Sequence, residues 1–153
     1  MLMFLIALFL IAGGLGSVFV QSSINTWYIF IKKPFFTPPG FVFAPVWTIL
    51  YILLAIYYYR LDKIYKETKN PVIKNIKGLF ILQLVLNYMW TPVFFGLRNI
   101  FGGLILLLAL DFLVGKMTWQ TFKIDKKCFY ISLVYFMWLL FATSLNLGTF
   151  ILN

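Results

Sequence analysis

The sequence predicts an all-α integral membrane protein, a five-transmembrane-helix bundle. Hydrophobic residues make up 63% of the 153 residues and charged residues only 11%, a balance that a water-soluble globule of this size cannot arrange. Five apolar stretches each approach the length of about 20 residues that a helix needs to cross the hydrocarbon. Little chain is left for a soluble region, so one membrane domain, residues 1–153, is expected. The approximate spans are residues 2–20, 42–60, 78–97, 100–121 and 129–151.

The positive charge of the chain lies in the loops between these spans. Of the 13 Lys and Arg residues, ten flank the second and fourth loops, and three, Lys32, Lys33 and Arg98, flank the first and third. Short loops rich in Lys and Arg stay in the cytoplasm, so these two loops and the amino terminus are expected inside. The net charge of +9 therefore reflects the topology of the chain. The expected partner is the lipid bilayer, and no binding of nucleic acid is expected.

The first helix is expected to end before Trp27, where Gln21, Ser22, Ser23 and Asn25 follow the apolar run. A signal peptide is the alternative for this segment, but a positively charged region at its start is absent. Trp27 and Tyr28 suit an aromatic anchor at the membrane surface, and Tyr28 is also a candidate ligand contact. Glycines in this helix, and the pair Gly102-Gly103, allow close helix approach, either within the bundle or in the homodimer that we expect.

The first loop is rich in proline and aromatic residues. Pro34, Pro38 and Pro39 precede Gly40, and Pro45 falls in the first turn of the next apolar run. Since each proline fixes one backbone dihedral and removes a donor, this segment is a shaped loop that ends in a helix starting near residues 41–43. Pro38 is expected to belong to a stiff lid over the helix ends.

Aromatic and polar side chains share faces of the second and third helices. Trp47, Tyr51 and Tyr58 recur at helical spacing, which is typical of packing. In the third helix the stripe holds amides and aromatic residues, and polar amides in hydrocarbon must face protein or a wet cavity. The members of this stripe are Gln83, Asn87, Trp90, Thr91 and Phe94.

The last two helices carry Asp111 and a second stripe. Asp111 is the only carboxylate in the middle of a span, so it is either functional or held protonated in an interhelical hydrogen bond. The fifth-helix stripe places the small Ala142 one turn beyond a tryptophan, which makes a notch beside a flat wall. This stripe consists of Trp138, Ala142, Leu145, Asn146 and Thr149.

No catalytic constellation emerges from the sequence. There is no histidine and a single cysteine, Cys128, so Ser and Thr have no histidine base, and a metal site has almost no ligands to use. We expect no catalytic residues, no metal and no cofactor. An inward lining of Trp, Tyr, Phe, Asn, Gln and Ala suits a flat, largely apolar ligand with a few polar edges.

Motifs along almost the whole chain resemble the family of tryptophan-rich sensory proteins and translocator proteins, also called peripheral benzodiazepine receptors. The matching pieces are Trp27-Tyr28, Lys33-Pro34, Pro38-Pro39, Pro45-Val46-Trp47-Thr48, Leu50-Tyr51, Gln83-Leu84, Leu86-Asn87, Trp90, Phe94-Phe95-Gly96, Asp111, Trp119, Tyr135, Trp138, Phe141-Ala142 and Leu145-Asn146. This resemblance implies a five-helix membrane bundle, often dimeric, that binds porphyrins and benzodiazepine-type ligands under the first loop. The pocket lining that it implies is Trp47, Tyr51, Asn87, Trp90, Trp138, Ala142 and Asn146.

The chain departs from that family at two places. Val134 stands where the family usually has a proline, and no basic residue follows Lys127, so the family's sterol-recognition pattern is not carried over. We expect a protein of a prokaryotic cell membrane that binds porphyrins. The alternatives are light- and oxygen-dependent breakdown of a bound porphyrin and passive transport of hydrophobic molecules.

Overall fold

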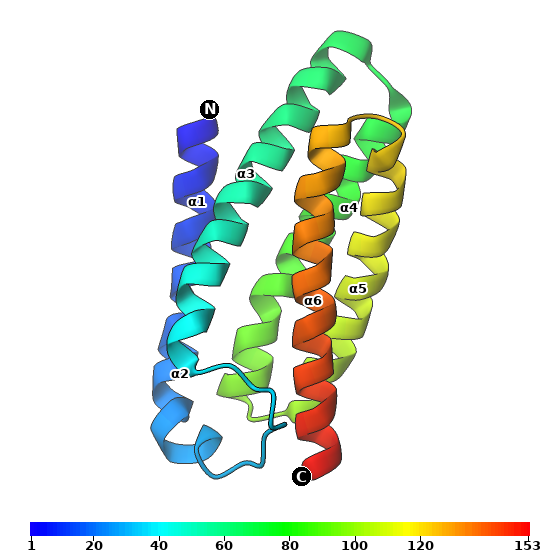
Figure 1. Cartoon of the computed structure of the whole chain (residues 1–153). Helices are drawn as coiled ribbons and strands as arrows, with labels where there is room; N and C mark the ends of the chain where they lie inside the picture. Colours follow the sequence, from blue (N-terminus) through cyan, green and yellow to red (C-terminus); the bar gives the residue numbers. More distant parts are fainter.

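The structure, a computed structural model, describes all residues 1–153 and contains five long helical segments and no strand (Figure 1). Each segment is long and apolar enough to cross a membrane, which confirms the predicted fold class. The elements are α1 (Leu2–Leu15), α2 (Ser17–Ser23), η1 (Ile24–Tyr28), η2 (Gly40–Val42), α3 (Phe43–Thr68), α4 (Pro71–Thr91), η3 (Pro92–Gly96), α5 (Ile100–Phe122) and α6 (Lys126–Leu152).

The first span runs further than the sequence indicated. Helical structure continues through the polar stretch as α2 and the π-helical η1, and it ends at Tyr28 rather than near residue 20. The hydroxyls of this stretch bond to carbonyl oxygens, since Ser23 Oγ donates to the Phe95 oxygen at 2.6 Å and Thr26 Oγ1 to the Ser22 oxygen at 2.9 Å. Polar side chains satisfied in this way do not break a helix.

The second loop is much shorter than the charged region around it. The approximate spans 42–60 and 78–97 leave residues 61–77 between them, but α3 extends to Thr68 and α4 begins at Pro71, so most of these residues are helical. Lys69 has a left-handed conformation with φ 53°, and the Asn70 side chain caps α4 by accepting from the Val72 N–H. Asn70-Pro71 therefore lies at the turn between α3 and α4, and the nearby Lys66 and Lys74 are helical.

The helices pack in an order that differs from their order in the chain. α1 lies against α3, α3 against α6, α6 against α5, and α5 against α4, while α2 packs on η3. Figure 1 shows the amino terminus and the α3–α4 and α5–α6 turns at one end of the bundle, and the carboxyl terminus with the first loop at the other. The two basic loops therefore share one end, as the predicted topology requires.

Most of the glycines that were candidates for a dimer contact are used inside the bundle. A Cβ on Gly103 would meet Asn146 Oδ1 and Phe94 at 2.9 Å, and one on Gly16 would meet Thr91 at 3.3 Å. Gly14 differs, because nothing lies within 4 Å of the position of its Cβ. The homodimer remains a prediction, and Gly14 is the glycine with space for a second copy.

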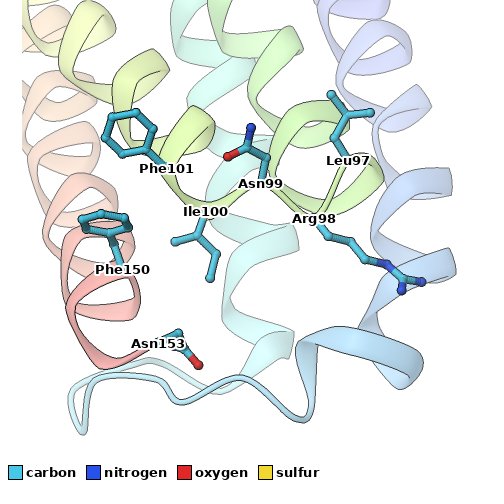
Figure 2. A pocket seen from close by; sticks show the side chains of 7 residues that line it. All are labelled: Leu97, Arg98, Asn99, Ile100, Phe101, Phe150 and Asn153. Atoms are coloured by element: carbon cyan, nitrogen blue, oxygen red, sulfur yellow. The ribbon is translucent and has the colours of Figure 1, made fainter.

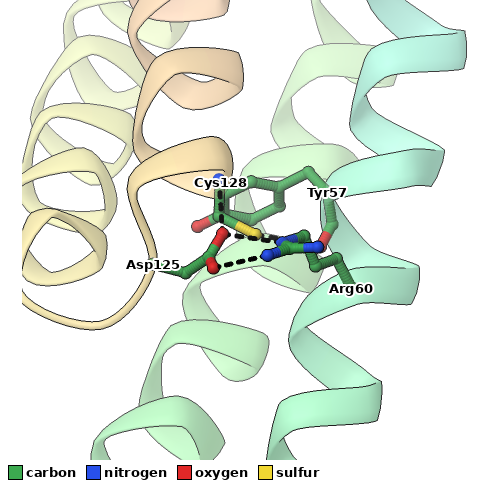
Figure 3. Close-up of polar contacts among 4 residues, drawn as sticks. All are labelled: Tyr57, Arg60, Asp125 and Cys128. Atoms are coloured by element: carbon green, nitrogen blue, oxygen red, sulfur yellow. Dashed lines mark hydrogen bonds and ion pairs between the residues drawn. The ribbon is translucent and has the colours of Figure 1, made fainter.

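An ion pair joins α3 to the start of α6 (Figure 3). The Arg60 guanidinium donates to both carboxylate oxygens of Asp125, with Nε–Oδ1 at 2.7 Å and Nη2–Oδ2 at 2.8 Å. The Asp125 carboxylate also accepts from the Cys128 backbone N–H at 2.9 Å, which caps α6. The Arg60 guanidinium, helped by this N–H, holds the pKa of the Asp125 carboxyl well below its usual range.

We expect this ion pair to make stability depend on pH in acid. The folded-state pKa of Asp125 is lowered, so its contribution is complete above the unfolded value of about 3.9 and is lost as the pH falls below it. Because the Arg60 side chain is 39% exposed, the pair is worth about 1 kcal/mol or less. The Asp125→Asn variant keeps a side chain that can cap α6, but it lacks the negative charge that pairs with Arg60. Thermal unfolding in detergent should therefore show a lower midpoint than the parent at pH 7 and a smaller difference at pH 3; an equal difference at both would contradict this.

Candidate functional site

Two tryptophans from different helices meet between α3 and α6. Trp47 of α3 stacks on Tyr51 one turn later, with ring centroids 5.6 Å apart. Trp138 of α6 presents its edge to Trp47, with centroids at 6.5 Å and planes at 88°. Phe43 approaches Trp138 from the start of α3 at 6.1 Å. The structure thus brings three of the predicted site residues, Trp47, Tyr51 and Trp138, into one group, which we call the aromatic wall.

An apolar groove of about 520 Å³ lies beside this wall, along the line where α3 and α6 meet. Trp138 is the one predicted site residue in it. The indole Nε1 of Trp138 is buried and has no hydrogen-bond partner in the protein. The groove is lined by Val46, Ile49, Leu50, Val134, Met137, Trp138 and Phe141.

Sequence reasoning missed six of these seven groove residues. Val134, Met137, Trp138 and Phe141 follow one another at offsets of three, four and seven, which places them on one face of α6. That spacing was visible in the sequence. It was overlooked because aliphatic residues at helical spacing in a membrane span are indistinguishable from lipid-facing positions.

A chain of hydrogen bonds connects the wall to the bundle interior. Tyr51 donates from its hydroxyl to Asn87 Oδ1 at 3.0 Å, Asn87 Nδ2 donates to the Tyr135 hydroxyl at 3.0 Å, and Tyr135 donates to Gln83 Oε1 at 2.8 Å. Gln83 and Tyr135 are fully buried, and Asn87 is nearly so. The predicted inward stripe of α4 is therefore a polar network shared among three helices.

Trp90, Phe94 and Tyr28 form a second aromatic group, away from the groove lining. Trp90 stacks on Phe94 with centroids 4.9 Å apart, and Tyr28 lies edge-on to Phe94 at 6.4 Å. The Trp90 indole N–H donates to Asn146 Oδ1 at 3.4 Å, and Asn146 Nδ2 donates to the Ile100 oxygen at 3.0 Å. Asn146 and Asn87 thus have separate hydrogen-bond partners and do not bond to each other.

The remaining predicted residues lie near these groups without lining the groove. Ala142 is half-buried and packs on the main core, Leu145 is buried, and Pro38 is partly buried in the first loop. The predicted notch at Ala142 is not part of the groove beside Trp138, whose α6 side consists of larger residues. Their role as ligand contacts stays a prediction.

Asp111 makes one interhelical hydrogen bond. Thr143 Oγ1 of α6 donates to Asp111 Oδ2 at 2.7 Å, while Asp111 Oδ1 is buried without a partner. No Lys or Arg forms an ion pair with this carboxylate. The contact matches the structural alternative for Asp111, an interhelical bond.

A further cavity of about 440 Å³ lies at the end of the bundle near the carboxyl terminus (Figure 2). Its polar side chains already have structural bonds: Asn99 Oδ1 caps α5 through the Gly102 N–H at 2.8 Å, and Asn153 bonds to both backbone groups of Lys32. Figure 2 shows the Arg98 guanidinium directed away from the aromatic residues of this cavity. Its lining is Leu97, Arg98, Asn99, Ile100, Phe101, Phe150 and Asn153.

The first loop is fastened to α6 at three points along its length. Lys32 exchanges two hydrogen bonds with the Asn153 side chain at 3.0 and 2.8 Å, Pro34 lies against Gly148, and Phe36 approaches Phe141 at 6.5 Å. Lys33 bonds back to the Tyr28 oxygen at 2.6 Å. The loop therefore covers the end of α6 next to the wall.

Comparison with known proteins places the chain in a recognised group. The sequence model of the TspO/MBR family matches residues 4–152. The tryptophan-rich protein TspO of Archaeoglobus fulgidus is 40% identical over 92% of this chain and 89% of its own length. Protein CrtK of Rhodobacter capsulatus is 31% identical over 93% and 86%, and the human translocator protein is 32% identical over 86% and 77%. The archaeal and bacterial relatives fit the expectation of a prokaryotic membrane protein.

We expect the buried hydroxyl of Tyr135 to stabilise the bundle. Tyr135→Phe removes the acceptor for Asn87 Nδ2 and the donor to Gln83 Oε1, and groups left unpaired in hydrocarbon cost about 1–3 kcal/mol. The unfolding midpoint in detergent should fall clearly. Tyr130→Phe is the matched control, because Tyr130 is 61% exposed. A Tyr135→Phe midpoint equal to that of the control would contradict a structural role for the network.

Proposed function

The chain belongs to the TspO/MBR family, and we propose that this membrane protein binds flat, largely apolar molecules of the porphyrin class against the aromatic wall. The observation that carries the proposal is Trp138, whose ring borders an apolar groove of about 520 Å³ and whose buried indole N–H has no partner in the protein. A ligand with a large π-system matches an aromatic ring that borders an apolar groove.

The aromatic wall supplies the recognition of a planar ring. Trp47 and Trp138 stand nearly perpendicular to each other at 6.5 Å, so a macrocycle that stacks on one ring meets the edge of the other. Both stacked and edge-on contacts are favourable, with about 1 kcal/mol per aromatic pair beyond the buried area.

The family resemblance also implied pocket residues deeper in the bundle, and their hydrogen bonds must rearrange before these residues can contact a ligand. Asn87, Trp90 and Asn146 are engaged in hydrogen bonds within the protein. A ligand that reached these side chains would have to replace those hydrogen bonds, which costs free energy. Contact with the ring face of Trp138 breaks no hydrogen bond. The wall is therefore the first contact in our proposal, and the deeper residues line the interior behind it.

We also propose that two copies of the chain associate. The lipid-exposed face of α1 carries Ile11 and Val18 at 65% exposure each, and Gly14 lies three residues after one and four before the other. With no atom within 4 Å of its Cβ position, Gly14 gives a neighbouring helix room for close approach.

We expect Trp138→Phe to weaken protoporphyrin IX binding about five-fold, because the loss of indole ring area removes on the order of 1 kcal/mol. Titration of the purified protein, followed by the porphyrin absorption band, measures the dissociation constant. Trp119→Phe is the matched control, since Trp119 is 72% exposed and lies outside the wall. Equal affinity of the two variants and the parent would place the ligand elsewhere.

The Ala142→Leu variant distinguishes a ligand bound at the aromatic wall from a ligand bound in the notch deeper in the bundle. Ala142 is not part of the groove lining, so a ligand held at the wall keeps its affinity in this variant, whereas a ligand held in the interior loses it. Unchanged unfolding midpoints confirm that each variant folds as the parent does.

A further inference from the structure

We propose that the outward face of α5 binds an anionic phospholipid of the leaflet at the end of the bundle that holds the two basic loops. This face is separate from the groove, whose lining comes from α3 and α6 alone, so its ligand is independent of porphyrin binding. We call the face the α5 stripe, and its members are Leu108, Phe112, Lys116, Trp119 and Lys123.

The α5 stripe is one continuous face of the helix. Its members follow one another at offsets of four, four, three and four residues, which is the spacing of neighbours on a helix surface. All five are exposed, with exposed fractions of 51% for Leu108, 70% for Phe112 and 72% for Trp119. The opposite face of the same part of α5 is buried in the bundle and consists of Leu107, Leu110, Val114, Met117, Thr118 and Thr121.

The length of α5 places the stripe across one leaflet. The helix begins at Ile100, directly after the polar Arg98 and its neighbour, and at about 1.5 Å per residue Trp119 lies about 28 Å further along. Because the hydrocarbon core is about 30 Å thick, Trp119 reaches its far boundary, where exposed tryptophans gather in membrane proteins. Leu108 and Phe112 lie about 17 Å and about 11 Å below Trp119, which is the depth of the acyl chains of one leaflet.

Two lysines without a counter-charge flank Trp119. Lys116 lies one turn deeper, where its apolar stem can extend and bring the ammonium group to the lipid headgroups, and Lys123 lies one turn beyond. Neither forms an ion pair with an acidic side chain. The ion pairs of the protein are Arg60–Asp125, Lys66–Asp62 and Lys77–Asp62. The charge of the α5 stripe at headgroup level is therefore complementary to a phosphate anion.

The surroundings of the α5 stripe add positive charge and no free carboxylate. Lys126 and Lys127 are exposed at the start of α6, three and four residues after Lys123. Asp125, the acidic residue of this turn, is held by the Arg60 guanidinium through two hydrogen bonds. A zwitterionic headgroup carries an ammonium group that these lysines repel. The surface therefore favours an anionic phospholipid such as phosphatidylglycerol.

Other occupants of an exposed helix face fit the α5 stripe less well. A second copy of the chain packed here about a two-fold axis would bring its own Lys116 and Lys123 against those of the first copy. A soluble acidic partner would match the lysines but would not reach Leu108 and Phe112 at the depth of the acyl chains. A phospholipid matches both parts, because its chains cover the apolar residues while its phosphate meets the lysines.

Removal of charge tests the headgroup contact. Lys116→Gln with Lys123→Gln removes two charges from the α5 stripe. Lys63→Gln with Lys69→Gln is the matched control, because these two lysines are also exposed and unpaired but belong to the end of α3. Native mass spectrometry of the protein in detergent measures the dissociation constants of dioleoylphosphatidylglycerol and dioleoylphosphatidylcholine.

We expect the parent to bind the anionic lipid more tightly than the zwitterionic one. The stripe variant should bind phosphatidylglycerol about thirty-fold more weakly than the parent, and the control should stay within about two-fold. Lys116→Arg with Lys123→Arg keeps the charge and should keep the parent affinity. Equal losses in the stripe variant and the control would overturn the site, because a diffuse positive field would then explain the binding. Equal affinity of the parent for the two lipids would overturn the anionic headgroup.

Glycerol phosphate distinguishes a lipid site from a site for free phosphate, because it carries the anion without acyl chains. We expect an excess of it to leave phosphatidylglycerol bound. Displacement of the lipid by glycerol phosphate would overturn the role of Leu108 and Phe112 in holding the chains.

Photo-cross-linking locates the lipid on the protein. Phosphatidylglycerol with a diazirine in an acyl chain is reconstituted with the protein in nanodiscs, and cross-linked peptides are identified by mass spectrometry after proteolysis. We expect the main cross-links between Leu108 and Phe112 in the parent, and loss of most of this signal in the stripe variant. Cross-links spread evenly over all exposed helix faces, and unchanged in the stripe variant, would overturn the proposal.

Discussion

The structure depends on one constraint, which is that polar groups inside hydrocarbon must find partners within the protein. The bonds from Tyr51 through Asn87 and Tyr135 to Gln83 meet this constraint and join α3, α4 and α6 at their centres. Hydroxyls in the first span meet it locally, which is why that span stays helical to Tyr28. Close helix packing follows, because these short bonds fix the distances between the helix axes.

Some buried polar atoms do not meet this constraint. Three buried side-chain atoms have no partner: Gln83 Nε2, Asp111 Oδ1 and Trp138 Nε1. The first two belong to side chains whose other atom is bonded within the bundle. The indole of Trp138 has a single donor and no such second atom, and the Trp138 side chain also lines the groove between α3 and α6.

The sequence predicted the five spans and the proline-rich loop before the second of them, because hydropathy and proline chemistry act locally. That Trp47 and Trp138 belong to one site was implied by the resemblance to the family. The sequence did not predict the ends of the helices, because α3 and α4 continue past the apolar runs into charged residues, where Asp62 pairs with Lys66 and Lys77. Nor did it predict the groove, whose shape depends on which faces of α3 and α6 meet. Such tertiary contacts leave no signal in the spacing of aliphatic residues.

The proposed function places a planar ligand against the ring of Trp138, which lines the groove. Nuclear magnetic resonance of protein labelled with ¹⁵N in its tryptophans resolves five indole N–H signals, one for each Trp. On addition of protoporphyrin IX, the account predicts the largest shift for Trp138, a smaller one for Trp47, and none for the exposed Trp119. A spectrum in which Trp27 and Trp90 shift while Trp138 stays in place would contradict it.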